Sequence, residues 1–199
     1  MKKFISFLCF LVILTAGSAA LATTTDQLWF FGTGEVMPAP DLVDNAYGIP
    51  KLKVDPGSGG GWQATAGGRT GVWSLSGEID VKIPNSPVLN PYKEITIDLT
   101  WAPGGADPWL PDQPLVGVSA IPMDRMTMSV VNDPIVGTIW TQSIYSIVIW
   151  PNPREEWIAI KGDILVDKLD IKTTCVPEPA TMGLLSLGGL ALLRSRRKH

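Results

Sequence analysis

The segment EITIDLTW, residues 94–101, alternates strictly between polar and apolar side chains. The apolar side chains fall on one face of an extended chain, and they are Ile95, Ile97, Leu99 and Trp101. The polar side chains between them fall on the opposite face, because successive side chains of a β-strand point to opposite sides. The segment therefore predicts a strand of an antiparallel sheet, with one buried face and one solvated face.

Other parts of the chain show the same period or a continuous apolar run, and we expect them to be strands: residues 73–83, 125–130, 144–150, 157–160 and 164–171. In the first of these, Gly77 keeps the register without adding a side chain. In the second, Met126, Met128 and Val130 form the expected buried face. Residues 144–150 are apolar on both faces, which is typical of a central strand. Turns rich in Pro, Asn, Gly and Asp separate the predicted strands.

The fold class follows from these strands and from the lack of helical patterns. Pro or Gly interrupts nearly every window long enough to form an amphipathic helix. Several strands within about 150 residues predict an all-β fold, a single antiparallel β-sandwich of jelly-roll type. We expect this domain to span residues 23–176. Residues 55–71 contain seven glycines, and we expect them to form a flexible loop within the domain.

Residues 1–22 have the pattern of a secretory signal peptide. Two lysines are followed by an apolar run over residues 4–16, and Ala20 and Ala22 supply the small residues of a cleavage site before Thr23. A permanent membrane anchor is the alternative, but the run is shorter than the roughly 20 residues of a membrane-spanning helix. We therefore expect export and cleavage by signal peptidase.

The C-terminal region, residues 177–199, shows a second signal in three parts. A Pro177-Glu178-Pro179 segment precedes an apolar stretch over residues 180–193 and a basic end: Arg194, Arg196, Arg197 and Lys198. As a helix the apolar stretch would span about 21 Å, short of a hydrocarbon core of about 30 Å unless flanking residues snorkel or the bilayer thins. The basic end stays cytoplasmic by the positive-inside rule. We expect a short transmembrane segment, with a plain tail anchor as the alternative.

This tail resembles the PEP-CTERM sorting signal of bacterial exported proteins, because its three parts occur in the same order. The resemblance implies recognition by exosortase, a membrane-embedded processing enzyme, with cleavage near Pro177–Pro179. It further implies a transient anchor in the inner membrane, then release to the cell surface or exterior, where such proteins accompany exopolysaccharide. In this chain the sorting residues are features of a substrate and not of an active site.

The body also resembles other PEP-CTERM proteins, of an uncharacterised surface group. The residues that carry this second resemblance are Trp150-Pro151-Asn152-Pro153, Glu156-Trp157, Val166-Asp167 and Cys175. The resemblance implies a β-sandwich that leads directly into the sorting signal, and it implies no activity.

Charge and residue counts exclude several classes of function. The whole chain has a net charge of −3, but the leader holds two of its 16 basic residues and the tail holds four. Only Glu178 of the 19 acidic residues lies outside the body, so ten basic and 18 acidic residues leave the body at −8. Such a body is not expected to bind nucleic acid. The single histidine, His199, cannot serve catalysis or metal binding in the upstream domain.

The eight tryptophans all lie in the body and suggest carbohydrate binding. An indole ring can stack on the apolar face of a sugar, and Trp62 and Trp109 lie beside polar side chains in expected loops. Core packing is the alternative for most of these tryptophans. Cys175 would be the only cysteine of the mature chain, either as a quiet thiol or paired with another molecule.

Other chemistries find weaker support. The glycines of residues 57–61 lack the order of a phosphate-binding loop. Asp163, Asp167 and Asp170 offer calcium ligands, but strand geometry turns Asp170 to the opposite face, so we expect no metal site and no cofactor. A carboxylate-based glycan hydrolase needs two facing acids, and Glu155 and Glu156 of an extended strand point apart. We expect a structural or interaction protein that is not an enzyme.

Overall fold

The computed structural model describes residues 22–87, 91–104, 112–121, 123–132 and 139–176. Within these ranges every regular element is a β-strand, and no helix there is long and apolar enough to cross a membrane. Residues Thr23–Val176 form one compact unit. The expected all-β class is confirmed.

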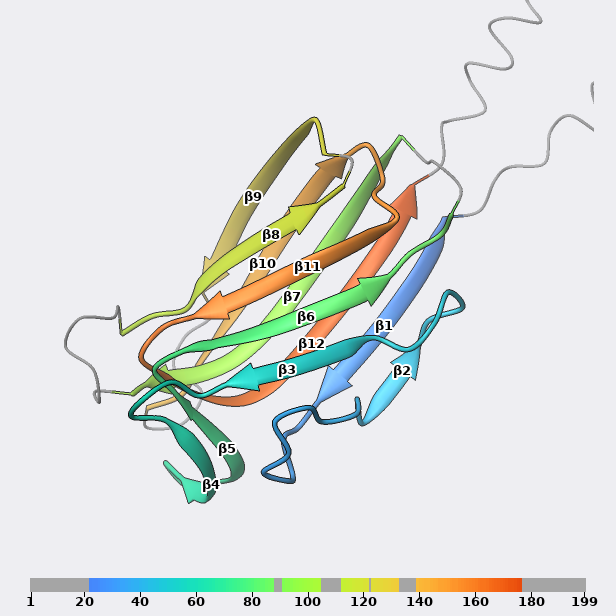
Figure 1. The fold of residues 1–199 in the computed structure, drawn as a ribbon. Coiled ribbons are helices and arrows are strands. Elements are labelled where there is room, and N and C mark those ends of the chain that lie inside the picture. Colours follow the sequence, from blue (N-terminus) through green and yellow to red (C-terminus); the bar gives the residue numbers. More distant parts are fainter. Residues whose placement is uncertain (1–21, 88–90, 105–111, 122, 133–138, 177–199) are drawn as a thin grey trace, which may run out of the picture. The chain divides into compact units, whose positions relative to one another are not determined.

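Two antiparallel sheets make up this unit (Figure 1). Sheet A is the larger, and its strands are β1 (Thr23–Trp29), β2 (Leu42–Asp44), β4 (Gly61–Ala66), β5 (Arg69–Leu75), β7 (Tyr92–Pro103), β9 (Arg125–Asn132), β10 (Thr141–Trp150) and β12 (Ile164–Val176). Sheet B is formed by β3 (Lys51–Asp55), β6 (Glu78–Pro84), β8 (Leu115–Ala120) and β11 (Glu155–Lys161). The main path of sheet A runs β2-β1-β12-β7-β10-β9, and sheet B runs β3-β6-β11-β8.

The chain passes between the two sheets after β2, β3, β5, β6, β7, β8, β10 and β11. As a result, neighbours within a sheet come from distant parts of the sequence, such as β1 beside β12 and β6 beside β11. Strands interleaved in this way between two antiparallel sheets form the β-sandwich that the sequence predicts.

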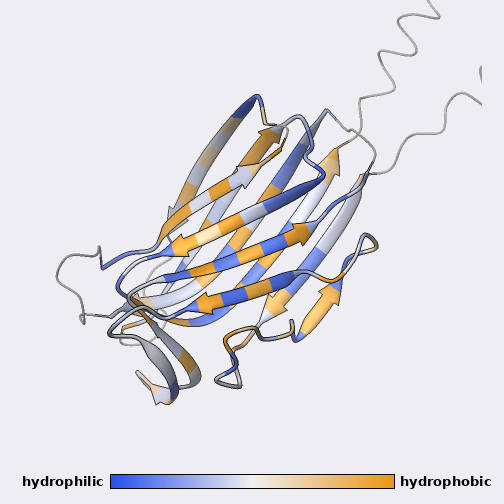
Figure 2. Cartoon of the chain, in the orientation of Figure 1, coloured by the Kyte–Doolittle hydropathy of each residue, from blue (hydrophilic) through white to orange (hydrophobic). Residues whose placement is uncertain are grey.

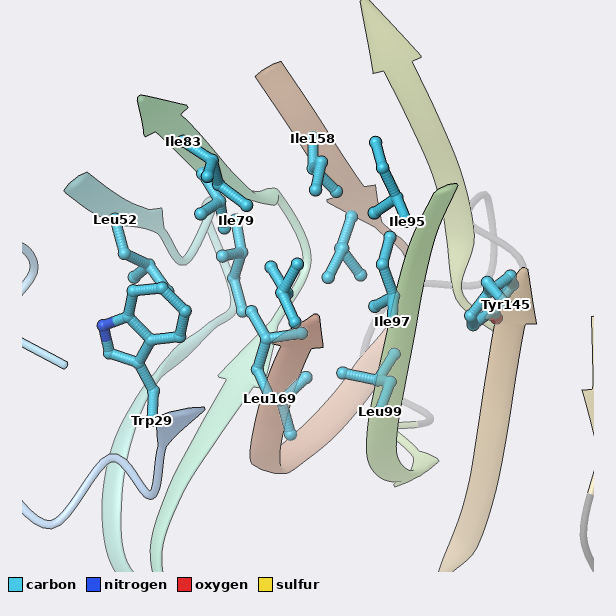
Figure 3. Close-up of a cluster of buried hydrophobic side chains, with 14 of the residues drawn as sticks. Trp29, Leu52, Ile79, Ile83, Ile95, Ile97, Leu99, Tyr145, Ile158 and Leu169 are labelled. Atoms are coloured by element: carbon cyan, nitrogen blue, oxygen red, sulfur yellow. The ribbon is translucent and has the colours of Figure 1, made fainter. Parts of the chain in front are cut away.

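The core lies between the sheets, where apolar side chains from both inner faces meet. Alternating hydropathy along the strands is visible in Figure 2. Ile95, Ile97 and Leu99 of β7 point inward from sheet A, while Ile79 and Ile158 point inward from sheet B (Figure 3). The alternation in residues 94–99 is therefore expressed as one buried face and one wetter face, whereas Thr100 of the predicted wet face is buried and Trp101 is only partly buried.

Residues 73–83 do not form the single strand that their alternation predicts. The chain turns at Ser76 and Gly77, so that residues up to Leu75 belong to sheet A and residues from Glu78 belong to sheet B. The Ser76 amide donates a hydrogen bond to the carbonyl of Pro56 at 2.8 Å. A Cβ atom at Gly77 would lie only 2.3 Å from the carbonyl oxygen of Asp55. The missing side chain thus permits a close backbone contact at a corner.

The glycine-rich region, residues 55–71, is likewise more ordered than the predicted flexible loop. It contains β4 and the start of β5, which pair as a hairpin with Ala66 opposite Arg69. Gly67 and Gly68 at the hairpin turn have φ angles of 56° and 79°, in the left-handed region that glycine adopts readily. These glycines make a tight turn rather than a loose one.

The prediction that one face of residues 125–130 is buried is wrong. Met126, Met128 and Val130 are 38%, 45% and 47% exposed. Their partners on β10 are Ile149, Ile147 and Tyr145, which are all buried, so the β9 side chains belong to the same inner face. β9 lies at the edge of sheet A, and the described part of sheet B ends at β8. The described strands of sheet B therefore leave the inner face of sheet A partly exposed to solvent at β9.

Both ends of the compact unit lie on adjacent strands. Thr23, the first residue of β1, is opposite Cys175 near the end of β12. Val176, the last residue of β12, is opposite Tyr92 of β7. The body is thus closed by pairing its first strand with its last.

We predict that Gly77→Ala destabilises the protein by about 1–3 kcal/mol, because the new methyl group would overlap the Asp55 carbonyl. Gly117→Ala in β8 is the matched control, since a Cβ there meets nothing within 4 Å. Urea unfolding of the two purified variants and the unmodified chain measures the difference. Equal stabilities for both variants would contradict this account of the corner.

Candidate functional site

Strand alternation places two charged residues on inner faces. Lys93 of β7 has the same parity as Ile95 and is buried, and Glu156 of β11 has the same parity as Ile158 and is buried. The first comes from sheet A and the second from sheet B, so they meet between the sheets. Asn85 joins them because it directly follows β6, whose last residue, Pro84, is opposite Glu155.

The three side chains form a closed set of polar contacts. The Lys93 Nζ donates to Glu156 Oε1 at 2.5 Å and also donates to Asn85 Oδ1. The Asn85 Nδ2 donates to Glu156 Oε2 and to the carbonyl of Pro153, the latter at 2.9 Å. The side chains of Lys93 and Glu156 are both 0% exposed. We call Lys93, Asn85 and Glu156 the buried triad.

Burial dominates the electrostatics of the buried triad. It raises the pKa of the Glu156 carboxyl to about 7, although the Lys93 charge and hydrogen bonds from Lys93 and Asn85 act in the opposite direction. Taking an ion pair out of water costs several kcal/mol for each ion before mutual attraction offsets it. Burial of the triad therefore costs free energy, and the hydrogen bonds among all three side chains are needed to offset that cost.

Cys175 lies next to the buried triad, opposite Lys93 in the β12–β7 register. Its thiol donates to Asn152 Oδ1 at 3.6 Å and is only 1% exposed. Burial raises the pKa of the thiol, which keeps it protonated. Of the two expectations for this cysteine, burial favours the quiet thiol over pairing with another molecule.

The side chains of the buried triad can react only with one another, because all three are buried. An amine, a carboxyl group and a carboxamide lie in mutual hydrogen-bond contact. These are the functional groups needed for proton transfer and for acyl transfer to nitrogen. None of these side chains is open to solvent beyond the 7% exposure of Asn85. A diffusing substrate has no route to them in this arrangement.

The two tryptophans predicted to bind sugars have different outcomes. Trp62 in β4 is half-buried, packs against the main core, and donates from its indole nitrogen to the carbonyl of Phe31 at 2.9 Å. Trp109 lies outside the described residues. Their joint role in glycan binding stays a prediction.

Trp157 is the strongly exposed tryptophan among the described residues, at 46%. It lies on the outer face of β11, opposite Ser119 of β8, and the ammonium group of Lys82 lies 5.0 Å from its ring centroid. The sequence carries a signal for this exposure, since Trp157 alternates with Glu156 and Ile158 of the inner face. Burial of those two neighbours turns Trp157 outward.

The aspartates considered for calcium are separately paired. The Asp167 carboxylate forms an ion pair with Arg69, and Asp170 lies 3.9 Å from both Lys168 and Lys172. Asp163 is buried, and its carbonyl accepts a hydrogen bond from Gly104 at 2.9 Å. In the part of the chain that the structure describes, no three acidic, cysteine or histidine residues are arranged to hold a metal ion.

A hollow of about 180 Å³ lies beside β9, next to Val130. Its lining combines aromatic and polar residues, namely Trp101, Gln113, Pro114, Val130, Ser143 and Tyr145. No pair of carboxylates faces this hollow among those residues.

The sequence-predicted signals at the two ends fall largely beyond the described residues. Ala20 is outside them, Ala22 is exposed, and Thr23 begins β1. Residues 177–199 are outside them too, including the predicted transmembrane segment. The predicted signal peptidase site stays a prediction.

Comparison with known protein families decides the nature of the C-terminal signal. Residues 176–198 match the model of the PEP-CTERM protein-sorting motif. The chain carries a PEP-CTERM sorting motif. The matched range includes Pro177, Glu178 and Pro179 and the arginines of the basic end. No curated protein and no solved structure matches the chain.

The PEP-CTERM motif implies an exported protein that is transiently anchored in the membrane and processed by exosortase. It begins at Val176, which is also the last residue of β12. The sorting motif therefore follows the folded body without an intervening linker.

We predict that the free energy of unfolding falls as the pH rises through the interval from 4.5 to about 7 and that Glu156 contributes to this fall. The folded state binds the Glu156 proton more tightly than the unfolded state does, so the stabilisation is complete below 4.5 and lost as the pH passes the folded pKa. Glu156→Gln should flatten this part of the profile. Urea unfolding at a series of pH values measures it.

Glu155→Gln is the matched control, because Glu155 is solvent-exposed and its hydrogen bond from Lys82 lowers its pKa. The contribution of Glu155 is present above its ordinary pKa and lost as the pH falls, so removing it changes the profile in the opposite sense. A Glu156→Gln profile parallel to that of the unmodified chain would contradict the prediction.

Proposed function

We propose that this exported protein acts at the cell surface or in the extracellular polysaccharide matrix, in a structural or interaction role and not as an enzyme. The observation that carries the proposal is the PEP-CTERM motif directly after β12. In this proposal, signal peptidase removes residues 1–22, residues 180–193 anchor the chain transiently in the inner membrane, and exosortase then processes it near Pro177–Pro179.

The placement of acidic side chains supports a role without catalysis. Glu155 lies at the surface in an ion pair with Lys82 at 2.7 Å, whereas Glu156 is sealed in the buried triad. These neighbouring acids therefore do not face each other across a cleft, which a glycan hydrolase would need. Glu156, whose pKa is raised to about 7 by burial, lies where a substrate cannot reach it.

We predict that replacing Pro177, Glu178 and Pro179 by alanines leaves the protein in the membrane fraction at its unprocessed size. The recognition element of exosortase would be lost while the apolar stretch remains. Fractionation and immunoblotting with an antibody against the body measure the outcome. Deleting exosortase should give the same result, and substitution of the exposed Glu35 by alanine is the control. Normal release of the triple-alanine variant would contradict the proposal that exosortase recognises these three residues.

Carbohydrate binding is a second candidate function, and the exposure of Trp157 favours it. Gly117 and Ser119 lie on the neighbouring strand, opposite Ala159 and Trp157 respectively, so bulky side chains do not flank the ring on that side. A sugar ring stacking there would take the place of the Lys82 ammonium group. Because the body carries −8, a neutral polysaccharide suits it better than an acidic one.

We predict that Trp157→Ala weakens binding to a neutral polysaccharide at least tenfold if this outer face is the binding site, because the exposed indole supplies the stacking surface. Affinity electrophoresis with neutral glucans measures the retardation. The Trp62→Ala, Trp109→Ala double variant tests the site expected from the sequence in the same gels. Unchanged retardation of the Trp157 variant would remove Trp157 from the proposal.

A further inference from the structure

We propose that Lys93 and Asn85 react with each other inside the sandwich to form an intramolecular amide cross-link, with Glu156 as the acid–base catalyst. The proposal rests on the geometry of the buried triad and is independent of sorting and of sugar binding. It assigns a chemical role to a buried, charged cluster that no diffusing substrate can use.

The reacting groups are already in contact. The Lys93 amine donates to the carbonyl oxygen of the Asn85 side chain, so the nucleophilic nitrogen lies beside the carbon that it must attack. Glu156 bridges the two nitrogens of the reaction, with Oε1 bound to Lys93 Nζ and Oε2 bound to Asn85 Nδ2. Groups held in this way gain a large rate advantage, because no translational freedom has to be lost.

The carbonyl of Pro153 fixes the amide further. It accepts from Asn85 Nδ2 at 2.9 Å, so the carboxamide has partners for both its oxygen and its nitrogen. This contact holds the leaving nitrogen away from the attacking amine. The Asn85 side chain is therefore oriented for the exchange of one nitrogen for another.

The atoms and protons of the step balance without any co-reactant. Glu156 takes a proton from the Lys93 ammonium group, and the neutral Nζ then attacks Asn85 Cγ. The Nζ–Cγ bond forms, and the tetrahedral intermediate passes a second Nζ proton through the Glu156 carboxyl group to Nδ2. The Cγ–Nδ2 bond breaks and ammonia leaves. The products are a secondary amide, ammonia and a protonated Glu156.

Burial favours the products over the starting groups. The reaction converts a buried ammonium–carboxylate pair into an amide and an uncharged acid, and it thereby removes the cost of keeping two ions out of water. Desolvation already favours the protonated form of Glu156. Loss of ammonia to solvent and exclusion of water from the site would make the reaction effectively irreversible.

The cross-link would tie the end of β6 to the start of β7, where the chain passes from sheet B to sheet A. It would therefore join the two sheets covalently beside the paired ends of the body. An exported chain whose single body cysteine is buried would gain a covalent tie that does not depend on redox conditions.

Mass spectrometry of the purified full chain tests the proposal. Trypsin cuts after Lys82, Lys93 and Arg125, so an unreacted chain yields peptides 83–93 and 94–125. An amidated Lys93 is no longer a trypsin site. We expect a single peptide, 83–125, lighter by one ammonia molecule than its sequence mass. Recovery of unmodified peptide 83–93 as the main product would overturn the proposal.

Variants assign the mass loss to the proposed bond. Lys93→Arg should abolish it, and persistence of the loss in that variant would instead assign it to cyclisation of Asn85 onto the Ser86 backbone. Asn85→Asp should lose water in place of ammonia and give the same cross-linked peptide. Glu156→Gln should leave the peptides unlinked, whereas Glu155→Gln, the exposed neighbour, should retain the cross-link. A cross-link formed equally in the Glu156→Gln variant would remove Glu156 from the catalytic role.

Discussion

The antiparallel pairing of β12 with β7 is the contact on which the larger sheet depends. It extends from Ile164 opposite Pro103 to Val176 opposite Tyr92, with one irregularity between Val166 and Lys168. β12 also pairs with β1 and with β5, so it joins the first, a middle and the last strand of the body. Sheet A is therefore incomplete until the last strand is in place. Folding must await the whole body, because non-local strand pairs form only after their distant segments are both available.

The buried triad depends on the same pairing. Cys175 of β12 lies opposite Lys93 and helps to enclose it, while β11 carries Glu156 in from the other sheet. Charges that would cost several kcal/mol if left alone are thus brought together only by the finished sandwich. Chemistry between Lys93 and Asn85 would follow folding rather than guide it, and it would report that both sheets have docked.

Sequence alternation predicts the sandwich and the inward face of the central part of β7. The parity of Ile95, Ile97 and Leu99 in β7 is expressed as predicted. The same parity places Lys93 and Glu156 inward, but period alone cannot say that they meet, because this depends on which strands face each other across the core. The wrong expectation at Met126 has the same origin, since exposure at β9 follows from its place at the edge of a sheet.

The corner at Gly77 shows a different limit. Its alternation is unbroken in the sequence, and only the close approach of the Asp55 carbonyl explains the turn. For the candidate sites, the order of Pro177, Glu178 and Pro179 with an apolar stretch and arginines identified the sorting motif, because a linear signal is read as sequence. The sequence pattern does not predict the surface around Trp157 or the buried triad, because each is assembled from several strands.

The end of β12 limits where the sorting motif can be processed without damage to the fold. A cut before Cys175 would remove the residue that pairs with both Thr23 and Lys93, and would open the buried side of the triad. A cut after Val176 leaves every β12 pairing in place. The folded body and the sorting motif therefore share a boundary at which release and integrity are compatible, and this boundary lies immediately before Pro177.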